Sequence, residues 1–403
     1  MRVLVADRLT EDSLDEMRSL GVEVRYEPDL RSEALPEALD GVNVLVVRGL
    51  EVREAALKAG KSLNLIIRAG SGVRNIDVAT ASERGIYVAS CPGKNASAVA
   101  ELTFTLIGSL DRRVPDAVAS LRSGQWNKDE FARAVGLAGR KIGILGLGQV
   151  GRAVLRLAHA YGMHAHAWSR SLTPSRAAEL GVTPAASPLE LARAVDVFTV
   201  HLELVPRTRG MVDRAVLSAL PDEAIFVNTA RPELVDYDAL VELAESKRLR
   251  VGLDVFPNEP STRIGRFAHP VLAGALVYGT PHIGASTDAA QITIANECAR
   301  ILRSFVTKGE VPNVVNISAT SWSRYQLVVR HIDQVGALAN VLGVLKRHGI
   351  NIHELDNTVF EGGRAACAKI RLGSRPSEDC LTEIMAFSDE VLHVDLVTLP
   401  NLA

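Results

Sequence analysis

The sequence predicts an α/β protein with two parallel sheets, followed by a small module of antiparallel strands and two helices. Two observations support this prediction. Short apolar runs alternate with helical patterns from residue 1 to about residue 280, which is typical of parallel sheets. A polar segment, 311–323, then precedes a strand-helix-strand-strand-helix-strand pattern, which is typical of a ferredoxin-like βαββαβ fold.

The first apolar runs predict the small parallel sheet of a flavodoxin-like domain. They are residues 3–6, 22–24, 44–47, 65–67 and 86–88. A long helix over 97–121, capped by Asn95 or Ser97, is expected to lead into a second domain, and a helix over 286–307 is expected to lead back. The predicted domains are therefore 1–96 with 283–310, an inserted domain 97–282, a linker 311–323 and a C-terminal domain 324–403.

The inserted domain opens on a glycine-rich turn. The apolar run 141–145 leads into Gly146-Leu147-Gly148-Gln149-Val150-Gly151 and then into a helical pattern. In this context the glycines allow a tight turn, a close approach of backbone to a pyrophosphate and close packing of helix and strand. The N-terminus of the helix supplies N–H donors to the phosphates. The turn predicts a Rossmann dinucleotide-binding domain.

The amino-acid composition argues against two classes of binding partner. The 45 basic and 47 acidic side chains leave a net charge of −2 without a basic tail, which argues against nucleic acid and anionic membranes. The four cysteines have no metal-ligand spacing, so no metal site is expected. The sequence enters a strand pattern at once and holds no membrane-length apolar run, so a cytoplasmic location is expected.

Polar side chains follow three strands of the predicted Rossmann domain. Arg231 follows Asn228-Thr229-Ala230, Glu259 follows the run 251–255, and His282 follows Thr280-Pro281. Ligands bind beyond the carboxyl ends of parallel strands, so these three should meet near the nicotinamide. Arginine suits a carboxylate, and a histidine beside a glutamate can transfer a proton near neutral pH. The sequence therefore predicts a hydride-transfer site.

The chain resembles the D-isomer-specific 2-hydroxyacid dehydrogenases over nearly its whole length. The resemblance rests on the motifs above and on the segments 68–77 and 95–102. The resemblance implies that Arg231 binds the substrate carboxylate and oxo group, that His282 is the acid/base and that Glu259 is its partner. The substrate-binding residues that it implies are Arg48 for a phosphate, Ser71, Gly72 and Val73 for the carboxylate, Asn95, and Lys128 reaching a neighbouring subunit. The cofactor-binding residues expected are Gly146, Gly148, Gln149, Val150, Gly151, Ser169, Arg170, His201, Thr229, Ala230, Asp254, Gly284 and Ala285.

The sequence departs from that family at four places. Pro232 replaces a glycine after Arg231, Arg74 replaces an acidic residue, and Glu203 stands where proline is usual. The strand end that normally carries an acidic residue for the ribose 2′-OH has Ser169 and Arg170 instead, which could accept a 2′-phosphate. NAD is the expected cofactor from the resemblance, and NADP is the alternative.

The C-terminal module resembles an ACT domain, a regulatory module for small molecules. The resemblance implies an amino-acid effector, serine first, held between two modules by His331, Asp333 and Asn351, with Asp333 standing where relatives have asparagine. A role in assembly alone is the alternative. A homodimer or homotetramer is expected.

The expected reaction is the NAD(P)-dependent oxidation of 3-phospho-D-glycerate to 3-phosphohydroxypyruvate, at the start of serine synthesis. One alternative is another D-2-hydroxyacid dehydrogenase, such as a glyoxylate or hydroxypyruvate reductase. A dinucleotide-sensing corepressor of the same fold is a second alternative, and the ACT-like module argues against it.

Overall fold

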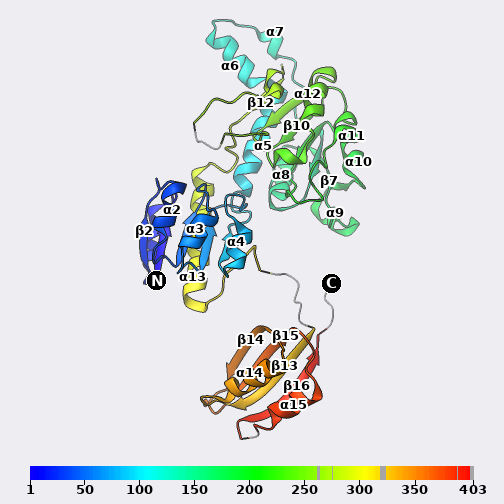
Figure 1. Ribbon diagram of the computed structural model, residues 1–403. Helices are drawn as coiled ribbons and strands as arrows, with labels where there is room; N and C mark the ends of the chain where they lie inside the picture. Colours follow the sequence, from blue (N-terminus) through cyan, green and yellow to red (C-terminus); the bar gives the residue numbers. More distant parts are fainter. Residues whose placement is uncertain (261–263, 275, 318–323, 388, 400–403) are drawn as a thin grey trace. The chain divides into compact units, whose positions relative to one another are not determined.

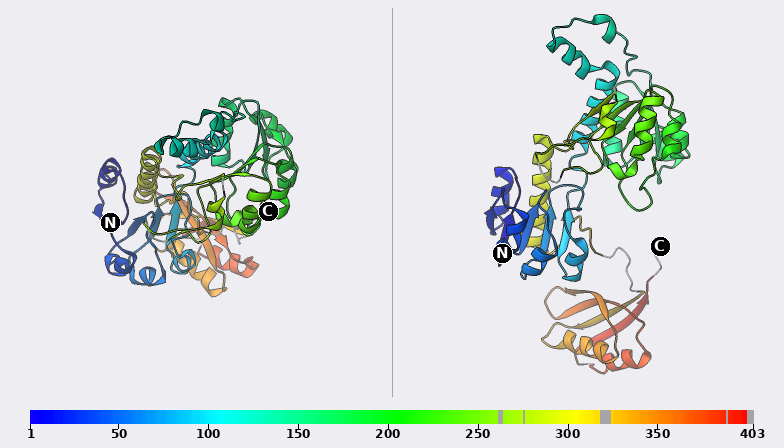
Figure 2. Two further views of the ribbon diagram at one scale, coloured as in Figure 1. Left: turned by 90° about the horizontal axis from the view of Figure 1, so that it is seen from above. Right: turned by 45° about the horizontal axis from the view of Figure 1, so that its top comes forward.

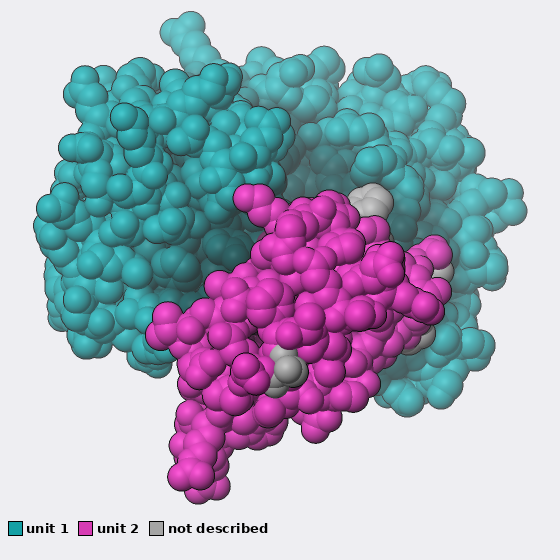
Figure 3. Space-filling model, turned by 60° about the horizontal axis from the view of Figure 1, so that its bottom comes forward, with its two compact units in different colours: residues 1–316 teal, residues 317–403 magenta. Residues whose placement is uncertain are grey.

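The computed structural model describes residues 1–260, 264–274, 276–317, 324–387 and 389–399. It divides into two compact units, 1–316 and 317–403, and each is described by itself (Figure 3). Unit 1 holds two parallel sheets (Figure 1). Unit 2 holds one antiparallel sheet with two helices.

The first sheet has five parallel strands in the order β2-β1-β3-β4-β5. Its strands are β1 (Arg2–Val5), β2 (Glu23–Tyr26), β3 (Val44–Val47), β4 (Leu65–Arg68) and β5 (Tyr87–Ser90). Its helices are α1 (Glu11–Arg18), α2 (Leu35–Ala38) after the 3₁₀ turn η1 (Ser32–Ala34), α3 (Glu54–Ala59) and α4 (Val78–Glu83). One apolar core joins the sheet to α1 and α13 and the other joins it to α2, α3 and α4, so both faces are covered.

The second sheet has seven parallel strands in the order β12-β11-β10-β9-β6-β7-β8. Its strands are β6 (Lys141–Leu145), β7 (His164–Trp168), β8 (Thr183–Pro184), β9 (Val197–Val200), β10 (Ile225–Asn228), β11 (Arg250–Leu253) and β12 (Val277–Gly279). Its helices are α8 (Gln149–Ala160), α9 (Pro174–Leu180), α10 (Pro188–Arg193), α11 (Arg214–Ser218) and α12 (Tyr237–Ser246), with the 3₁₀ turns η2 (Pro232–Leu234) and η3 (Pro270–Ala273). The chain order reverses between β6 and β9, which is the switch point where such sheets bind ligands.

Two long helices run between the sheets, α5 (Ala96–Arg112) and α13 (Asp288–Lys308) (Figure 2). The prediction of one helix over 97–121 is wrong. Arg113 adopts a left-handed conformation at φ 52°, and Pro115 cannot continue the hydrogen bonding of α5, so the chain restarts as α6 (Val114–Arg122) and then α7 (Lys128–Phe131). The side chain of Asn95 makes no capping bond to α5.

The predicted linker 311–323 is not uniform in structure. Val314 forms a bridge with Ala89, and the Asn316 Oδ1 accepts a 2.8 Å hydrogen bond from the Val88 N–H. Residues 313–316 therefore extend the edge of β5 as part of unit 1. Residues 318–323 lie outside the described residues.

Unit 2 confirms the predicted ferredoxin-like pattern, in the sheet order β14-β15-β13-β16. Its elements are β13 (Tyr325–Ile332), α14 (Ala337–Arg347), β14 (Ile352–Val359), β15 (Ala365–Leu372), α15 (Glu378–Met385) and β16 (Val391–Thr398). An apolar core lies between the two helices and alternate residues of the central strands. Among the described residues of the chain, no helix is long and apolar enough to span a membrane.

Candidate active site

The glycine-rich turn has the shape that a dinucleotide needs. Gly146 has a φ of +101°, and a Cβ at that position would lie 2.7 Å from the carbonyl oxygen of His201. A Cβ at Gly151 would overlap the carbonyl oxygen of Gly146. A Cβ at Gly148 would meet no atom within 4 Å, and no N-cap side chain bonds the first N–H groups of α8. The turn therefore fits a bound pyrophosphate.

His201 lies at the end of β9, beside this turn, and is buried. Its Nε2 pairs with the Thr199 hydroxyl at 2.8 Å, and its Nδ1 has no hydrogen-bond partner among the described residues. Burial lowers the pKa of His201 to about 3, so the ring is neutral near pH 7. A neutral ring with an unused nitrogen can serve a cofactor by hydrogen bonding but cannot donate a proton as an acid.

Asp254, at the end of β11, fixes the turn that carries His282. Its carboxylate accepts hydrogen bonds from the Thr280 hydroxyl at 2.6 Å and from the N–H groups of Ile283 and Gly284 at 2.8 Å each. Burial raises the pKa of Asp254, and these bonds act in the opposite direction. Asp254 is one of the residues expected to bind the cofactor, and in this structure both of its oxygens hold this turn.

His282 and Glu259 form a hydrogen-bonded pair. His282 Nδ1 lies 2.7 Å from Glu259 Oε2, and Glu259 Oε1 accepts a 2.9 Å bond from the Phe256 N–H. Burial acts to raise the pKa of Glu259, but the bonds from His282 and Phe256 outweigh it and leave this pKa lowered. An ionised carboxylate only accepts hydrogen bonds, so Nδ1 carries the proton and Nε2 is left as the basic nitrogen. His282 itself is held at a φ of 52°, a conformation that is uncommon outside glycine and is typical of functional sites.

Arg231 faces the loop after β4. A Cβ at Gly72 would lie 3.4 Å from Arg231 Nη2, so the guanidinium lies against the segment predicted to bind a carboxylate. Burial lowers the pKa of Arg231, Arg74 lowers it further, and Glu233 and Glu259 act to raise it. The charge of Glu259, which pairs with His282, therefore acts on Arg231 as well.

Pro232 is compatible with this arrangement. Arg231 is extended, with φ −146° and ψ 141°, as a residue before proline prefers. Pro232 then opens the turn η2 at a position where a backbone N–H would have no partner within the turn. The Asn228 side chain bonds both the Ala230 N–H and the Arg231 carbonyl, each at 3.0 Å, and so fixes the backbone around Arg231.

The carboxyl edge of the five-stranded sheet gathers cations. Arg48 follows β3, its N–H donates to Asp7, and its Nη1 bonds Gln291 at 2.7 Å. A cavity of about 440 Å³ is lined by Arg48 and Arg8, by one carboxylate, Asp288, and by Thr10 and Gln291 among others. Arg8 was not expected there from the sequence, because nothing in the pattern distinguishes it from a surface arginine.

Arg68 ends β4 and was also missed. Its side chain folds over Gly70, and its pKa is lowered by burial and then by the nearby Arg48 and Arg231. Its position at a strand end was the available signal. Arg231, Arg68 and Arg48 thus form a series of cations that leads to the cavity beside Arg8.

The predicted carboxylate segment meets Asn95. The Ser71 hydroxyl donates to Asn95 Oδ1 at 3.1 Å, and its loop lies against Arg231 at Gly72. Val73 follows in the same loop. The side chain of Asn95 is therefore used within the cleft rather than as a helix cap.

The structure gives a partner or an exposure for four further predicted residues. The Thr229 hydroxyl pairs with Thr103 of α5 at 2.9 Å, and Lys128 is exposed at the start of α7. Ser169 is half-buried and Arg170 is exposed after β7. The described residues include no cluster of three or more histidine, cysteine, aspartate or glutamate side chains that could hold a metal ion.

The predicted effector residues do not meet within one module. His331 is buried and bonds Asn357 at 3.1 Å, and Asp333 follows the same end of the sheet. Asn351 precedes β14 at the opposite end. The two ends are about 23 Å apart, which is the length of an eight-residue strand at about 3.3 Å per step.

Comparison with known proteins agrees with the geometry. Residues 104–284 match the family described as "D-isomer specific 2-hydroxyacid dehydrogenase, NAD binding domain". A solved structure, the TT0316 protein from Thermus thermophilus, is 33% identical, with a TM-score of 0.69 over 78% of this chain and all of that one. The chain belongs to the D-isomer specific 2-hydroxyacid dehydrogenase family.

Two further similar proteins have names that are more specific than the family description. D-3-phosphoglycerate dehydrogenase of Methanocaldococcus jannaschii is 37% identical over 83% of this chain and 64% of its own length. The NAD⁺-bound 3-phosphoglycerate dehydrogenase of Entamoeba histolytica is 25% identical, with a TM-score of 0.64 over 79% of this chain and 99% of that one. The chain thus spans a little under two thirds of the curated relative's length, and its Rossmann domain is an NAD-binding domain of this family.

Proposed function

We propose that this D-2-hydroxyacid dehydrogenase oxidises 3-phospho-D-glycerate to 3-phosphohydroxypyruvate with NAD. The observation that carries the proposal is the hydrogen-bonded His282–Glu259 pair. The charge of Glu259 also acts on Arg231, and the guanidinium of Arg231 lies against Gly72. NAD, when bound at the glycine-rich turn, supplies the acceptor for the hydride from C2 of the substrate.

The chain's own residues supply the rest of the chemistry. Arg231 binds the carboxylate and the C2 oxygen through its two-pronged guanidinium, with the backbone of 71–73 on the other side of the carboxylate. As the C2–H bond breaks, the hydroxyl proton passes to His282 Nε2, and the carbonyl forms at C2. Glu259 holds Nδ1 and stabilises the imidazolium that results. In the reverse direction the same nitrogen returns the proton.

The cationic edge supports a phosphorylated substrate. Arg48 and Arg8 line the 440 Å³ cavity, and the charges of both Arg48 and Arg231 act to lower the pKa of Arg68. A substrate with an anionic group at each end would place its carboxylate at Arg231 and its phosphate in this cavity. An unphosphorylated hydroxy acid would leave these arginines without a ligand.

A steady-state assay tests the proposal. The protein is given NAD or NADP with 3-phospho-D-glycerate, D-glycerate or D-lactate, and the reduced cofactor is followed. We expect the highest kcat/KM with 3-phospho-D-glycerate. Equal or better turnover of the unphosphorylated acids would contradict the phosphate assignment and favour a reductase of smaller acids. No turnover of any of these acids would contradict the proposed activity.

We also propose that the enzyme pairs with a second copy through α6 and α7, and that Lys128 acts in the neighbouring site. None of the nine residues of α6 is buried, and Trp126 is 83% exposed in the connection to α7. An arm with so much exposed apolar surface is expected to be covered by a partner. Trp126→Glu should convert a dimer to monomers in sedimentation, whereas Lys128→Ala should lower kcat/KM without dissociation. A wild-type monomer would contradict both parts.

For the C-terminal module we propose an amino-acid effector, serine first, held between two modules. His331 and Asp333 lie at one end of its sheet and Asn351 at the other, so only a second module can bring all three chemistries to one ligand. The Asp333 carboxylate suits an ammonium group. Calorimetry with serine should give heat that Asp333→Ala abolishes, and removal of residues 322–403 should leave an active enzyme that no longer responds. Without heat and without a change in kinetics, the module serves assembly only.

A further inference from the structure

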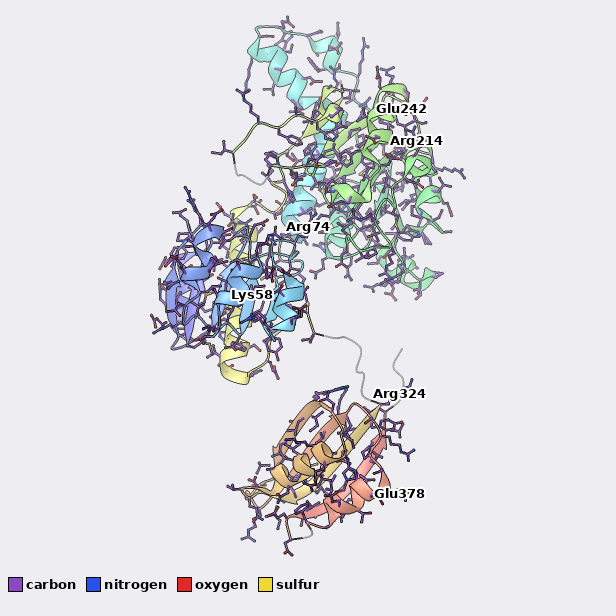
Figure 4. The ribbon with its side chains drawn as sticks, in the orientation of Figure 1. Lys58, Arg74, Arg214, Glu242, Arg324 and Glu378 are labelled. Carbon is purple, nitrogen blue, oxygen red and sulfur yellow. The ribbon has the colours of Figure 1, made fainter. Side chains whose placement is uncertain are left out.

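An ion pair joins the two walls of the active-site cleft. Arg74 Nη1 lies 2.8 Å from Glu233 Oε1. Arg74 is in the loop after β4 of the five-stranded sheet, and Glu233 is in η2 after β10 of the seven-stranded sheet. Figure 4 labels Arg74 in the region between the two sheets. The pair therefore links segments that belong to opposite sides of the cleft.

Both partners adjoin the proposed carboxylate site. Arg74 directly follows the segment 71–73, and Glu233 is two residues beyond Arg231. The two segments also meet at the carboxylate site itself, because Gly72 lies against Arg231 Nη2. The ion pair is a second contact between the same two segments.

The Glu233 carboxylate can compete with a substrate carboxylate for Arg231, because its charge already acts on that residue. Its side chain is 28% exposed, and its second oxygen, Oε2, is buried without a hydrogen-bond partner among the described residues. A carboxylate in that state gains from any cation within reach. The only ion pair that the described residues give Glu233 is the one with Arg74, while Glu233 also acts electrostatically on Arg231.

We infer that Arg74 is a positioning residue for the reaction. By holding the Glu233 carboxylate across the cleft, it keeps that carboxylate from the guanidinium of Arg231. Arg231 Nη1 donates to the Ala230 carbonyl at 2.6 Å, and the guanidinium has no carboxylate partner among the described residues, so it can bind the carboxylate of the substrate. This inference rests on the proposed role of Arg231. Arg74 is one of the places where the chain departs from the family pattern, and the inference gives its positive charge a role. Its partner Glu233 lies in η2, which begins at Pro232, a second such place.

Kinetic measurements on Arg74→Met, Glu233→Gln and the double variant test the inference. In Arg74→Met the freed Glu233 competes with substrate, so KM should rise about tenfold, as for loss of one charge-assisted bond, with kcat within about twofold. The double variant removes the competitor, so its KM should return to within about threefold of wild type. A merely structural role would give a double variant at least as impaired as the single one.

The matched control is the pair Arg303–Glu16. Its distance is 2.7 Å and its side chains are 53% and 31% exposed, against 57% and 28% for Arg74 and Glu233. Arg303→Met should leave KM unchanged. If Arg74→Met fails to fold by circular dichroism, Arg74→Gln, which also lacks the charge, takes its place.

Binding without turnover separates this inference from the proposed activity. Oxalate, which mimics the carboxylate and oxo oxygens of a 2-oxo acid, is titrated calorimetrically into the NADH-loaded protein. Arg74→Met should weaken oxalate binding about tenfold and the double variant should restore it, whether or not phosphoglycerate is turned over. An unchanged oxalate affinity in Arg74→Met, a double variant as weak as the single one, or a wild type that does not bind oxalate would overturn the inference.

Discussion

At the carboxyl edge of the five-stranded sheet, β3 and β4 lead to Arg48 and Arg68, with Arg8 facing the adjoining cavity. At the same edge of the seven-stranded sheet, β9, β11 and β12 lead to His201, Asp254 and His282. The first edge offers permanent positive charge, and the second offers a neutral buried histidine, a carboxylate that holds a turn, and the His282–Glu259 pair. Arg231, after β10, faces the loop of the other sheet at Gly72.

The two histidines of the second edge show how local structure divides the work. His201 is buried against Thr199, and its pKa falls to about 3, so it stays neutral. His282 lies in a turn that Asp254 holds, at hydrogen-bond distance from Glu259. The same residue type thus has two different surroundings, because the His201 ring meets a neutral hydroxyl and the His282 ring meets a carboxylate. The comparison predicts that variants at the two edges will change different kinetic constants.

The largest effect is expected at the proton-transferring edge. His282→Ala should lower kcat by about 10²- to 10⁴-fold, because it removes the group that takes the hydroxyl proton. The measurement is steady-state turnover with saturating substrate and NAD. His348→Ala is the matched control, since His348 also pairs with a glutamate, Glu383, at 2.8 Å, but in unit 2. Equal losses in the two variants would contradict the assignment.

The next effect is expected at the cationic edge. Arg48→Ala should raise KM for 3-phospho-D-glycerate about 10- to 100-fold, the range expected when a charge-assisted contact is lost, while changing KM for D-lactate little. The ratio of the two KM values is the measurement, because a general disturbance of the fold would affect both acids. If the ratio stays constant, Arg48 does not bind a phosphate and the two edges do not divide the work as proposed.

A stability measurement tests the helix that runs between the two sheets. Glu297 of α13 accepts bonds from Arg300, Lys94 and Asn313, which lower its pKa to about 2 against 4.5. A lowered pKa stabilises the fold above about pH 4.5, and this contribution is lost as the pH falls toward 2. Glu297→Gln should therefore lower the free energy of unfolding by about 1–2 kcal/mol at pH 7 and by much less near pH 2.

Urea unfolding at both pH values measures that difference. Glu23→Gln is the control, because Glu23 is an exposed carboxylate paired with Arg2. It should change the unfolding free energy little at either pH. A Glu297→Gln variant with the same pH dependence as wild type would show that its ion pairs contribute nothing to folding.

The smallest effect is expected at the far end of the cofactor site. Ser169→Asp should raise KM for NADP about tenfold through repulsion of the 2′-phosphate and leave KM for NAD within about twofold. The measurement is KM for both cofactors at a fixed substrate concentration. Loss of NAD binding as well would indicate that position 169 supports the turn rather than reading the ribose.

The sequence was sufficient to predict much of this protein. Alternating apolar runs and helical patterns predicted both parallel sheets and the C-terminal module, because strand and helix periodicity is a local property. The sequence also predicted the glycine-rich turn, because only glycine tolerates the crowding at Gly146 and Gly151. Polar residues at strand ends indicated Arg231, Glu259 and His282, because parallel strands deliver their carboxyl ends to one edge.

Only the tertiary structure decided which side chains meet. The carboxylate of Asp254 is engaged by the turn 280–284, the Thr229 hydroxyl pairs with α5, and Arg8 reaches the cavity beside Arg48. Arg74 and Glu233 are 159 residues apart in the chain and become partners only when the two sheets face each other. Sequence patterns specify backbone periods and turns, whereas partners of this kind depend on the packing of distant segments, which no local pattern encodes.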